Sequence, residues 1–380
     1  MNVPEPADDL ASTSKSTTSK VKERAVQAAV SLLIGGGMLW FAFRDLPANE
    51  AAMADGVVTF SERLSSLWEM IAVIPWQQHL LYLSLVIIQF ILRSLRWRIQ
   101  AEGVSGSSIP VRQALAINSV AFAAVFLLPF RLGEFVRPVL SQRHGFMSAS
   151  AGLANSAVER ILDGLVTSVF FAGVLIFLGD RSLPSYVQNA GVLAFVVFGA
   201  IALSLVLAVV WREASIKFWQ ALLEKIHPIL AEKLVGLLVS FLDGLRCFRT
   251  FAAFAGYFFI TAIYWLLNGA AVWLLLRGMG IEVDLVVGYF CLSFLILAVM
   301  LPAPPGNLGN FHAFCKESLM LLGVGAGPAL AFAIVLHAWQ VLSLLLWSGF
   351  WLLTGEVSLG EVAEAASGDE PVDSLRAQAK

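Results

Sequence analysis

The sequence predicts an all-α polytopic membrane protein. Hydrophobic residues make up 58% of the 380 residues and charged residues only 14%, and the mean hydropathy is +0.78. Soluble domains carry about 45–50% apolar and about 25% charged residues. Several apolar runs reach the roughly 20 residues that span a hydrocarbon core about 30 Å thick. These runs must be helical, because lipid cannot satisfy open backbone hydrogen bonds.

About eight hydrophobic segments follow one another along the chain, at roughly 26–44, 79–99, 111–128, 150–179, 188–211, 251–276, 285–301 and 328–354. We expect residues 1–25 to be a disordered cytoplasmic segment, because they are rich in Ser, Thr and Lys. Residues 215–249 mix apolar residues with lysines, as in an amphipathic helix at the membrane interface. An acidic tail, expected to be poorly ordered, occupies 355–380. The remainder, 26–354, is predicted to be a single transmembrane domain.

The distribution of Lys and Arg predicts the orientation of the helices. Basic residues before the first segment place the N terminus in the cytoplasm. The second helix is expected to end on the same side with three arginines, Arg93, Arg96 and Arg98. The stretch 212–249 is basic too, yet three apolar segments lie before it, and three full crossings would place it outside.

One of these three segments is therefore expected not to cross. We predict that 111–128 enters the bilayer, breaks at Pro129 and returns as a short helix over 131–141. Broken backbone at membrane depth is tolerated only where it is buried in protein or lines a wet cavity. The alternative is that 111–128 spans the membrane and that its arginines lie at the outer surface.

A short internal repeat supports the re-entrant segment. LPFRLGEF at 128–135 is similar to LPAPPGNLGNF at 301–311, and each follows a medium apolar segment and precedes a long one. The repeat elements would cover about 111–179 and 285–354.

If both copies re-enter, the chain makes six full crossings, has both termini in the cytoplasm, and carries two re-entrant helical hairpins in an inverted repeat. In the two copies Glu159 corresponds to His337, because these residues follow Gly145 and Gly323 at the same distance along the sequence. Paired broken helices near the midplane are typical of transporter binding sites.

The first break carries the candidate binding residues. Arg131, Glu134 and Arg137 are spaced i, i+3, i+6, which keeps them on one side of a helix. Glu134 can brace both arginines, whose guanidinium forks suit a phosphate or carboxylate. We therefore predict an anion-headgroup site, with Pro129 and Gly133 forming the backbone of the hairpin. The alternative is a set of interfacial anchors whose side chains extend to water.

Three charged residues begin the long segment after this break: Glu159, Arg160 and Asp163. Charges so close to an apolar run are costly unless they are paired. Glu159 and Asp163 are four residues apart on one face, where they could hold Arg131 or Arg137. The alternative is that they lie just outside the bilayer.

The second copy supplies further candidates for headgroup binding, namely Asn307, His312, Lys316 and His337. Its hairpin backbone is predicted from Pro305, Gly306 and Gly309. A lone membrane histidine such as His337 is, however, more often a packing residue than a ligand. Trp265 and Asn268 are weaker candidates, which we expect to pack between helices.

Other functional classes find little support. The three cysteines, Cys247, Cys291 and Cys315, are spread out without a CxxC pair, so we expect packing residues rather than disulfides or a zinc site. HExxH, GxSxG and phosphate-loop motifs are absent from the sequence. The net charge of −2 gives no reason to expect nucleic acid. We predict no metal, no cofactor and no catalytic residue.

The first break and the helix after it resemble the signature of the flippase-like integral membrane family, in the stretches PFRLGEFVRPVL, HGF and AVERILDGL. This family is also known as the lysylphosphatidylglycerol synthetase transmembrane-region family. PAPPGNLGNFHAF resembles the family's downstream Pro-Gly element, and the resemblance covers roughly 26–354. It extends to Arg131, Gly133, Glu134, Arg137, Glu159, Arg160 and Asp163 in the first motif and to Pro305, Gly306 and Gly309 in the second. It implies a bacterial inner-membrane protein that translocates lipids or lipid-linked intermediates.

The resemblance also has limits. In two-domain relatives such a membrane part flips an aminoacylated phospholipid made by an attached soluble transferase domain. We expect no such domain here, so the resemblance does not imply aminoacyl transfer. Other stand-alone relatives are associated with polyprenyl-linked sugar or hopanoid pathways. Many members have a glutamate where this chain has His312, and an arginine near His337. The substrate here is therefore expected to differ from an aminoacyl-lipid if those positions select the headgroup.

Taken with the resemblance, the residues predict a flippase or facilitator that moves an anionic lipid or lipid-linked intermediate across the cytoplasmic membrane. Arg131 and Arg137 would engage the phosphate, and Glu134, Glu159 and Asp163 would position them. The expected partners are membrane lipids. Two alternatives remain: a membrane-embedded transferase with Glu159 or His337 as base, and a non-catalytic membrane partner of a lipid-synthesis complex.

Overall fold

The computed structural model contains only α- and 3-10 helices over the residues that it describes. Those are 65, 68–128, 133–178, 183–225, 247–299 and 305–367, with a few isolated residues between 226 and 246. Several predictions lie outside them: the segment 1–25, the helix at 26–44, the end of the acidic tail, and the break residues Pro129 and Arg131.

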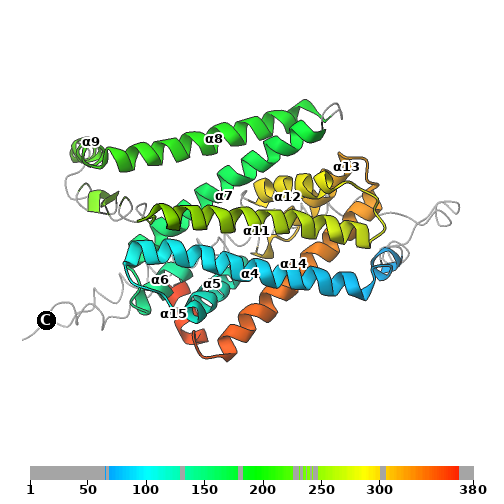
Figure 1. Ribbon diagram of the computed structural model, residues 1–380, viewed down its shortest axis with the longest axis horizontal. Helices are drawn as coiled ribbons and strands as arrows, with labels where there is room; N and C mark the ends of the chain where they lie inside the picture. The colour runs from blue at the N-terminus through cyan, green and yellow to red at the C-terminus, as the bar shows by residue number, and fades with distance from the viewer. Residues whose placement is uncertain are drawn as a thin grey trace, which may run out of the picture.

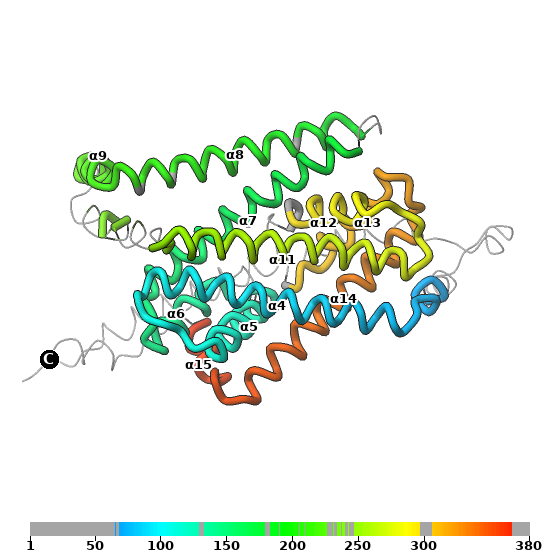
Figure 2. Tube along the Cα trace, in the orientation of Figure 1, coloured from blue at the N-terminus to red at the C-terminus, as the bar shows by residue number. Residues whose placement is uncertain are grey.

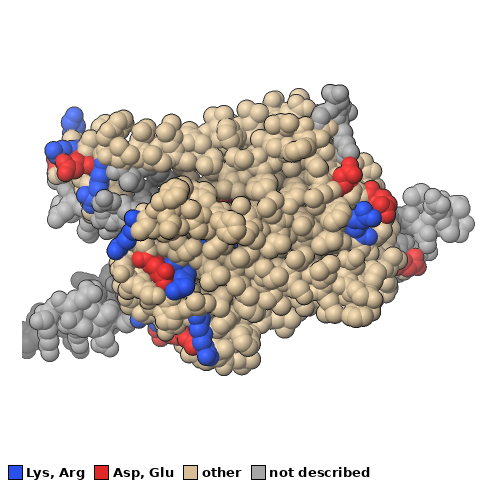
Figure 3. All heavy atoms as spheres, viewed as in Figure 1, with Lys and Arg blue, Asp and Glu red and all other residues tan. Residues whose placement is uncertain are grey.

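Within the described residues, five helices are long and apolar enough to cross a membrane. They are α4 (Trp76–Ser105), α7 (Ala149–Leu178), α8 (Ser185–Val210), α11 (Phe251–Gly278) and α14 (Ala326–Leu353). Each overlaps one of the predicted crossings, and the sixth predicted crossing is the one at 26–44. Charged side chains gather at the two ends of the long axis, and the belt between them is almost free of charge on the face shown (Figure 3). The bundle therefore has the surface expected of a protein that crosses a bilayer along this axis.

Two shorter apolar helices, α5 (Val111–Leu127) and α12 (Leu285–Val299), coincide with the segments expected to re-enter. Each is followed by a break and a short helix, α6 (Val136–Arg143) after α5 and α13 (Asn310–Met320) after α12. The second break contains a 3-10 turn, η2 (Pro305–Asn307). α6 packs against α5, and α13 packs against α12. The first pair lies toward one end of the bundle and the second toward the other (Figure 1).

The two short helices end in the same way. Gly145 and Gly323 adopt left-handed backbone conformations, with φ of 73° and 86°. The next residue in each copy donates its N–H five residues back, from Phe146 to the Ser141 carbonyl at 2.9 Å and from Val324 to Leu319 at 3.1 Å. This is the Schellman pattern, which favours glycine because no Cβ opposes a positive φ. The order of elements suggested by the repeat therefore recurs in the structure.

The two repeats exchange packing partners. α4 and α11 run side by side through the centre of the bundle (Figure 2). α5 packs against α14, whereas α12 packs against α7, so each short helix contacts the long helix of the other repeat. This exchange joins the two copies into one bundle.

Two helices lie in the segments predicted as an amphipathic interfacial stretch and as an acidic tail. α9 (Arg212–Glu224) covers the start of the predicted amphipathic stretch, and none of its residues is buried. Part of the tail expected to be poorly ordered instead forms α15 (Leu359–Ser367), which packs on α6. Its first turn is capped reciprocally by Ser358 and Glu361, whose carboxylate accepts from the Ser358 backbone N–H at 2.7 Å. Val357 and Ala365 are buried against the bundle, which explains the order.

Candidate functional site

A partly open cavity of about 290 Å³ lies in the middle of the bundle. Its wall is formed by α4, α5, α7, α11, α12, η2, the first turn of α13, and α14, so both repeats contribute. Most of the wall is apolar, and the polar side chains include Gln89, Arg93, Arg160, Asp163, Asn268, Asn307 and Gln340. Such a wall suits an amphiphile whose polar end needs a few specific contacts.

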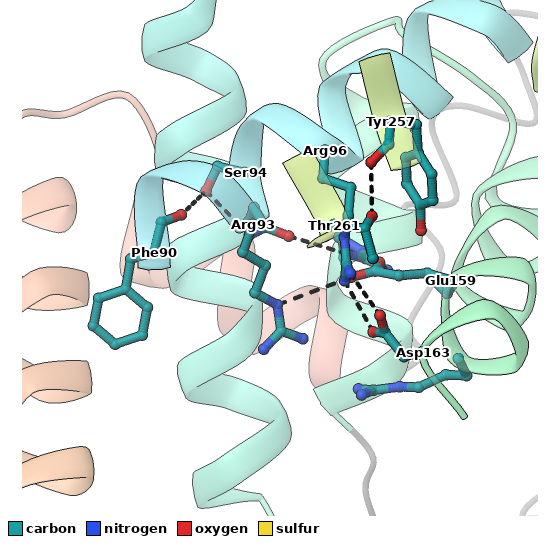
Figure 4. Close-up of polar contacts among 12 residues, drawn as sticks. Phe90, Arg93, Ser94, Arg96, Glu159, Asp163, Tyr257 and Thr261 are labelled. Carbon is teal, nitrogen blue, oxygen red and sulfur yellow. Dashed lines mark hydrogen bonds and ion pairs between the residues drawn. The ribbon is translucent and has the colours of Figure 1, made fainter. Parts of the chain in front are cut away.

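A buried ion cluster borders this cavity (Figure 4). The Arg96 guanidinium donates to the carboxylates of Glu159, at 2.9 Å, and of Asp163, through both of its terminal nitrogens. Arg137 approaches the other Glu159 oxygen at 2.6 Å. Glu159 thus joins α4 to α6 through α7, and Arg96 and Glu159 are only 1% and 2% exposed. The predicted pairing of Glu159 with Arg137 is confirmed, whereas Asp163 pairs with Arg96.

The Arg137 guanidinium has protein partners on three sides. Besides Glu159, it donates to Asn118 Oδ1 and to Ser156 Oγ, both at 3.0 Å. Asn118 in turn donates to Ser94 at 3.1 Å. These bonds tie α6 to α5, α7 and α4, so Arg137 holds the short helix in place.

Arg93 has a different environment, and the sequence did not identify it as a site residue. Its Nε lies 3.9 Å from Glu159, and its guanidinium lies over the Phe122 ring, 3.6 Å from the centroid. Within the described part of the chain, no group accepts a hydrogen bond from it. Figure 4 shows the end of the guanidinium directed away from Arg96 and Asp163. Arg93 is 9% exposed and lines the cavity.

The placement of Arg93 and Arg96 corrects the expectation that they end α4 at the membrane surface. Both are buried in the bundle, and of the three only Arg98 has the partly exposed position expected of a helix-end arginine, paired with Glu102 at 2.8 Å. The sequence did hold a signal for this inward position. Both arginines lie inside the apolar segment 79–99, where a charge is costly unless it serves a site.

A smaller hollow of about 20 Å³ adjoins the cavity near the first break, and Arg93, Gly133, Glu134 and Arg160 are among the residues that line it. Glu134 Oε1 lies 3.8 Å from Arg160, and Arg137 pairs with Glu159. The bracing of Arg131 and Arg137 by Glu134 stays a prediction. Gly133 is required by close approach, since a Cβ there would lie 2.1 Å from the α5 backbone at Ala124.

The second break has unusual backbone geometry at the cavity wall. Gly306 has φ of 70° and Asn307 has φ of 52°, the only positive φ at a non-glycine residue in the described part of the chain. His337 Nε2 lies 2.8 Å from the Gly306 carbonyl oxygen and fixes this turn to α14. Strained backbone persists only where its surroundings hold it, and it often marks functional sites. Gly309 follows with φ of 85°.

Three predicted ligands of the second copy lie behind this turn rather than in the cavity wall. The His312 and His337 rings are edge to face with centroids 4.7 Å apart, and Phe311 stacks on His337 at the same distance. His312 and Lys316 are buried, with 6% and 2% exposure. Their role in binding a headgroup stays a prediction.

A family model described as the lysylphosphatidylglycerol synthase TM region matches residues 52–348, most of the chain. The chain belongs to the lysylphosphatidylglycerol synthase transmembrane-region family. It is thus a multi-pass membrane protein. No curated protein matches this family member at a significant level, and neither does any solved structure.

In this lysylphosphatidylglycerol synthase transmembrane-region protein, arginines outnumber carboxylates at the site. The described groups are four arginines (Arg93, Arg96, Arg137 and Arg160) and three carboxylates (Glu134, Glu159 and Asp163). Arg96 and Arg137 are hydrogen-bonded within the cluster, while Arg93 faces the cavity. The arrangement can therefore accept a negative charge at Arg93.

Proposed function

We propose that this protein moves an anionic lipid or lipid-linked intermediate across the bacterial cytoplasmic membrane, and that Arg93 binds the phosphate in the central cavity. The buried guanidinium of Arg93 carries this proposal. Its carboxylate neighbour, Glu159, lies 3.9 Å from Nε and is held more closely by Arg96 and Arg137. A charge at membrane depth is costly without a close partner. A phosphate oxygen would accept charge-assisted hydrogen bonds from the N–H groups of Arg93, whose planar guanidinium fork suits a phosphate.

The neighbouring charges support this role by positioning. Glu159 and Asp163 fix Arg96, and Glu159 with Asn118 fixes Arg137. We assign these residues to shaping the site rather than to contacting the lipid. Arg131 stays a candidate ligand on its sequence position alone.

The arrangement of helices also favours transport. We propose that α5–α6 and α12–α13 are re-entrant hairpins of an inverted repeat, one entering from each side. Their breaks adjoin one cavity, as expected where two repeats enclose a transport site. One end of the bundle carries segments with several basic residues, which supports a cytoplasmic assignment for that end: Arg98, Arg112, Arg143, Lys217 and Arg249. We propose on the sequence alone that both termini are cytoplasmic as well.

Purified protein in liposomes provides the test. A fluorescent phosphatidylglycerol is placed in both leaflets, and its accessibility to a membrane-impermeant quencher is followed over time. We expect Arg93→Ala to slow exchange at least ~10-fold, because the phosphate loses its charged partner. Arg112→Ala is the matched control, since Arg112 is an exposed arginine paired with Glu356 away from the cavity.

If Arg93→Ala exchanges lipid as fast as the unaltered protein while eluting as the same folded species, the proposed site is wrong. Product formation from lipid donors and acceptors, without exchange, would instead favour the transferase alternative. Retained cellular function after Arg93 and Glu159 are neutralised together would favour a non-catalytic partner.

A further inference from the structure

We infer that the cavity accepts a phosphodiester headgroup whose outer part is neutral and hydroxyl-bearing, and that it rejects headgroups carrying an amine. The inference rests on the proposed function and concerns which lipid the same cavity selects. Two independent features support it: the pairing of every described carboxylate at the site, and the neutral polar groups on the cavity wall.

The carboxylates at the cavity are already engaged by arginines. Asp163 receives two hydrogen bonds from Arg96, and Glu159 contacts both Arg96 and Arg137. Glu134, in the adjoining hollow, lies 3.8 Å from Arg160. An ammonium group entering the cavity would therefore have to compete with a fixed guanidinium for its counter-ion. It would also be repelled by Arg93, and burying an unpaired charge is costly.

The rest of the polar wall is neutral. Side-chain amides from four different elements line the cavity, namely those of Gln89, Asn268, Asn307 and Gln340. The Asn268 amide nitrogen donates to the Tyr264 carbonyl of its own helix at 2.9 Å, which leaves its oxygen as an acceptor for a ligand. A side-chain amide has both hydrogen-bond donors and an acceptor. It can therefore bind a hydroxyl group, which also donates and accepts hydrogen bonds.

Two wall residues add unpaired donors. Gln89 Nε2 and Trp265 Nε1 have no acceptor among the described residues, and their side chains are 8% and 7% exposed. Gln89 lies one turn before Arg93 on the same face of α4, and Trp265 lies on the neighbouring α11. Small movements of these side chains would offer their donors to oxygens of a polyol next to a phosphate held at Arg93. A protonated amine has no lone pair, so it cannot accept hydrogen bonds from Gln89 and Trp265.

Matched lipids separate this inference from the proposed function. Liposomes containing the protein are loaded in turn with phosphatidylglycerol and lysylphosphatidylglycerol that carry the same labelled acyl chain. We expect phosphatidylglycerol to exchange at least ~10-fold faster. Asn268→Asp, which adds a carboxylate to the wall, should lower that ratio by raising the rate for the amine-bearing lipid, whereas Asn268→Leu should slow phosphatidylglycerol without helping the other lipid.

Equal rates for the two lipids in the unaltered protein would overturn the inference. If both rates still fall in Arg93→Ala, the proposed function survives that failure. Exchange of neither lipid above the level of empty liposomes would overturn the proposed function itself. A ratio unchanged by Asn268→Asp, with the variant folded, would also contradict the assigned role of the neutral wall.

Discussion

At the scale of single residues, Glu159 is the central charge of the site. It is 2% exposed and contacts Arg96 at 2.9 Å, Arg137 at 2.6 Å and Arg93 at 3.9 Å. Its spacing before Asp163 and its position after the first break predicted one of these partners. The position of Arg93 and Arg96 inside an apolar segment indicated that they serve a site. That they contact Glu159 could not be predicted, because the pairing depends on how α4 packs against α7. Burial is a tertiary property that spacing along one helix does not determine.

Replacing this carboxylate should therefore destabilise the bundle. We expect Glu159→Gln to lower the free energy of unfolding by roughly 3–5 kcal/mol, because it leaves buried arginines short of a counter-ion. Titration with a denaturing detergent would measure the change. Glu364→Gln is the control, since Glu364 is 61% exposed and its pair with Arg143 contributes under about 1 kcal/mol. Equal losses for the two variants would contradict the buried cluster.

At the scale of elements, the breaks decide the shape of the site. The apolar runs predicted most helices within a few residues, and the shared Pro and Gly pattern predicted that α5 and α12 are followed by interruptions. The sequence could not show that the second turn is bonded to His337, nor that Gly133 contacts the α5 backbone. Those contacts join residues far apart in the chain or depend on the path of the break.

Gly133 and Gly145 should tolerate alanine very differently. Gly133→Ala places a Cβ 2.1 Å from backbone atoms of Ala124, which cannot move aside, so we expect little folded protein. The Cβ added by Gly145→Ala would have no atom within 4 Å. The positive φ at this position alone should lower the free energy of unfolding, by about 1–2 kcal/mol. Folded yield after size-exclusion chromatography and thermal unfolding would compare them. A well-folded Gly133→Ala protein would contradict the close packing of this break.

At the scale of the whole molecule, the exchange of partners between repeats creates the cavity. α5 contacts α14 and α12 contacts α7, so residues of both copies meet around one space. The sequence repeat predicted two similar halves, and the structure shows the same order of elements and the same glycine-ended short helices. Which short helix packs on which long helix could not be predicted, because the apolar faces of these helices are too uniform to specify a partner.

The central claim is that a lipid phosphate enters this cavity and is held at Arg93. Photo-crosslinking tests it directly, with a photoreactive phenylalanine replacing Phe126, which lines the cavity, or Leu346, which is 60% exposed on α14. We predict that position 126 captures a labelled anionic lipid and loses most of that signal when combined with Arg93→Ala. Position 346 should capture lipid equally in both backgrounds. Capture at 126 that is absent, or unchanged by Arg93→Ala, would contradict the claim.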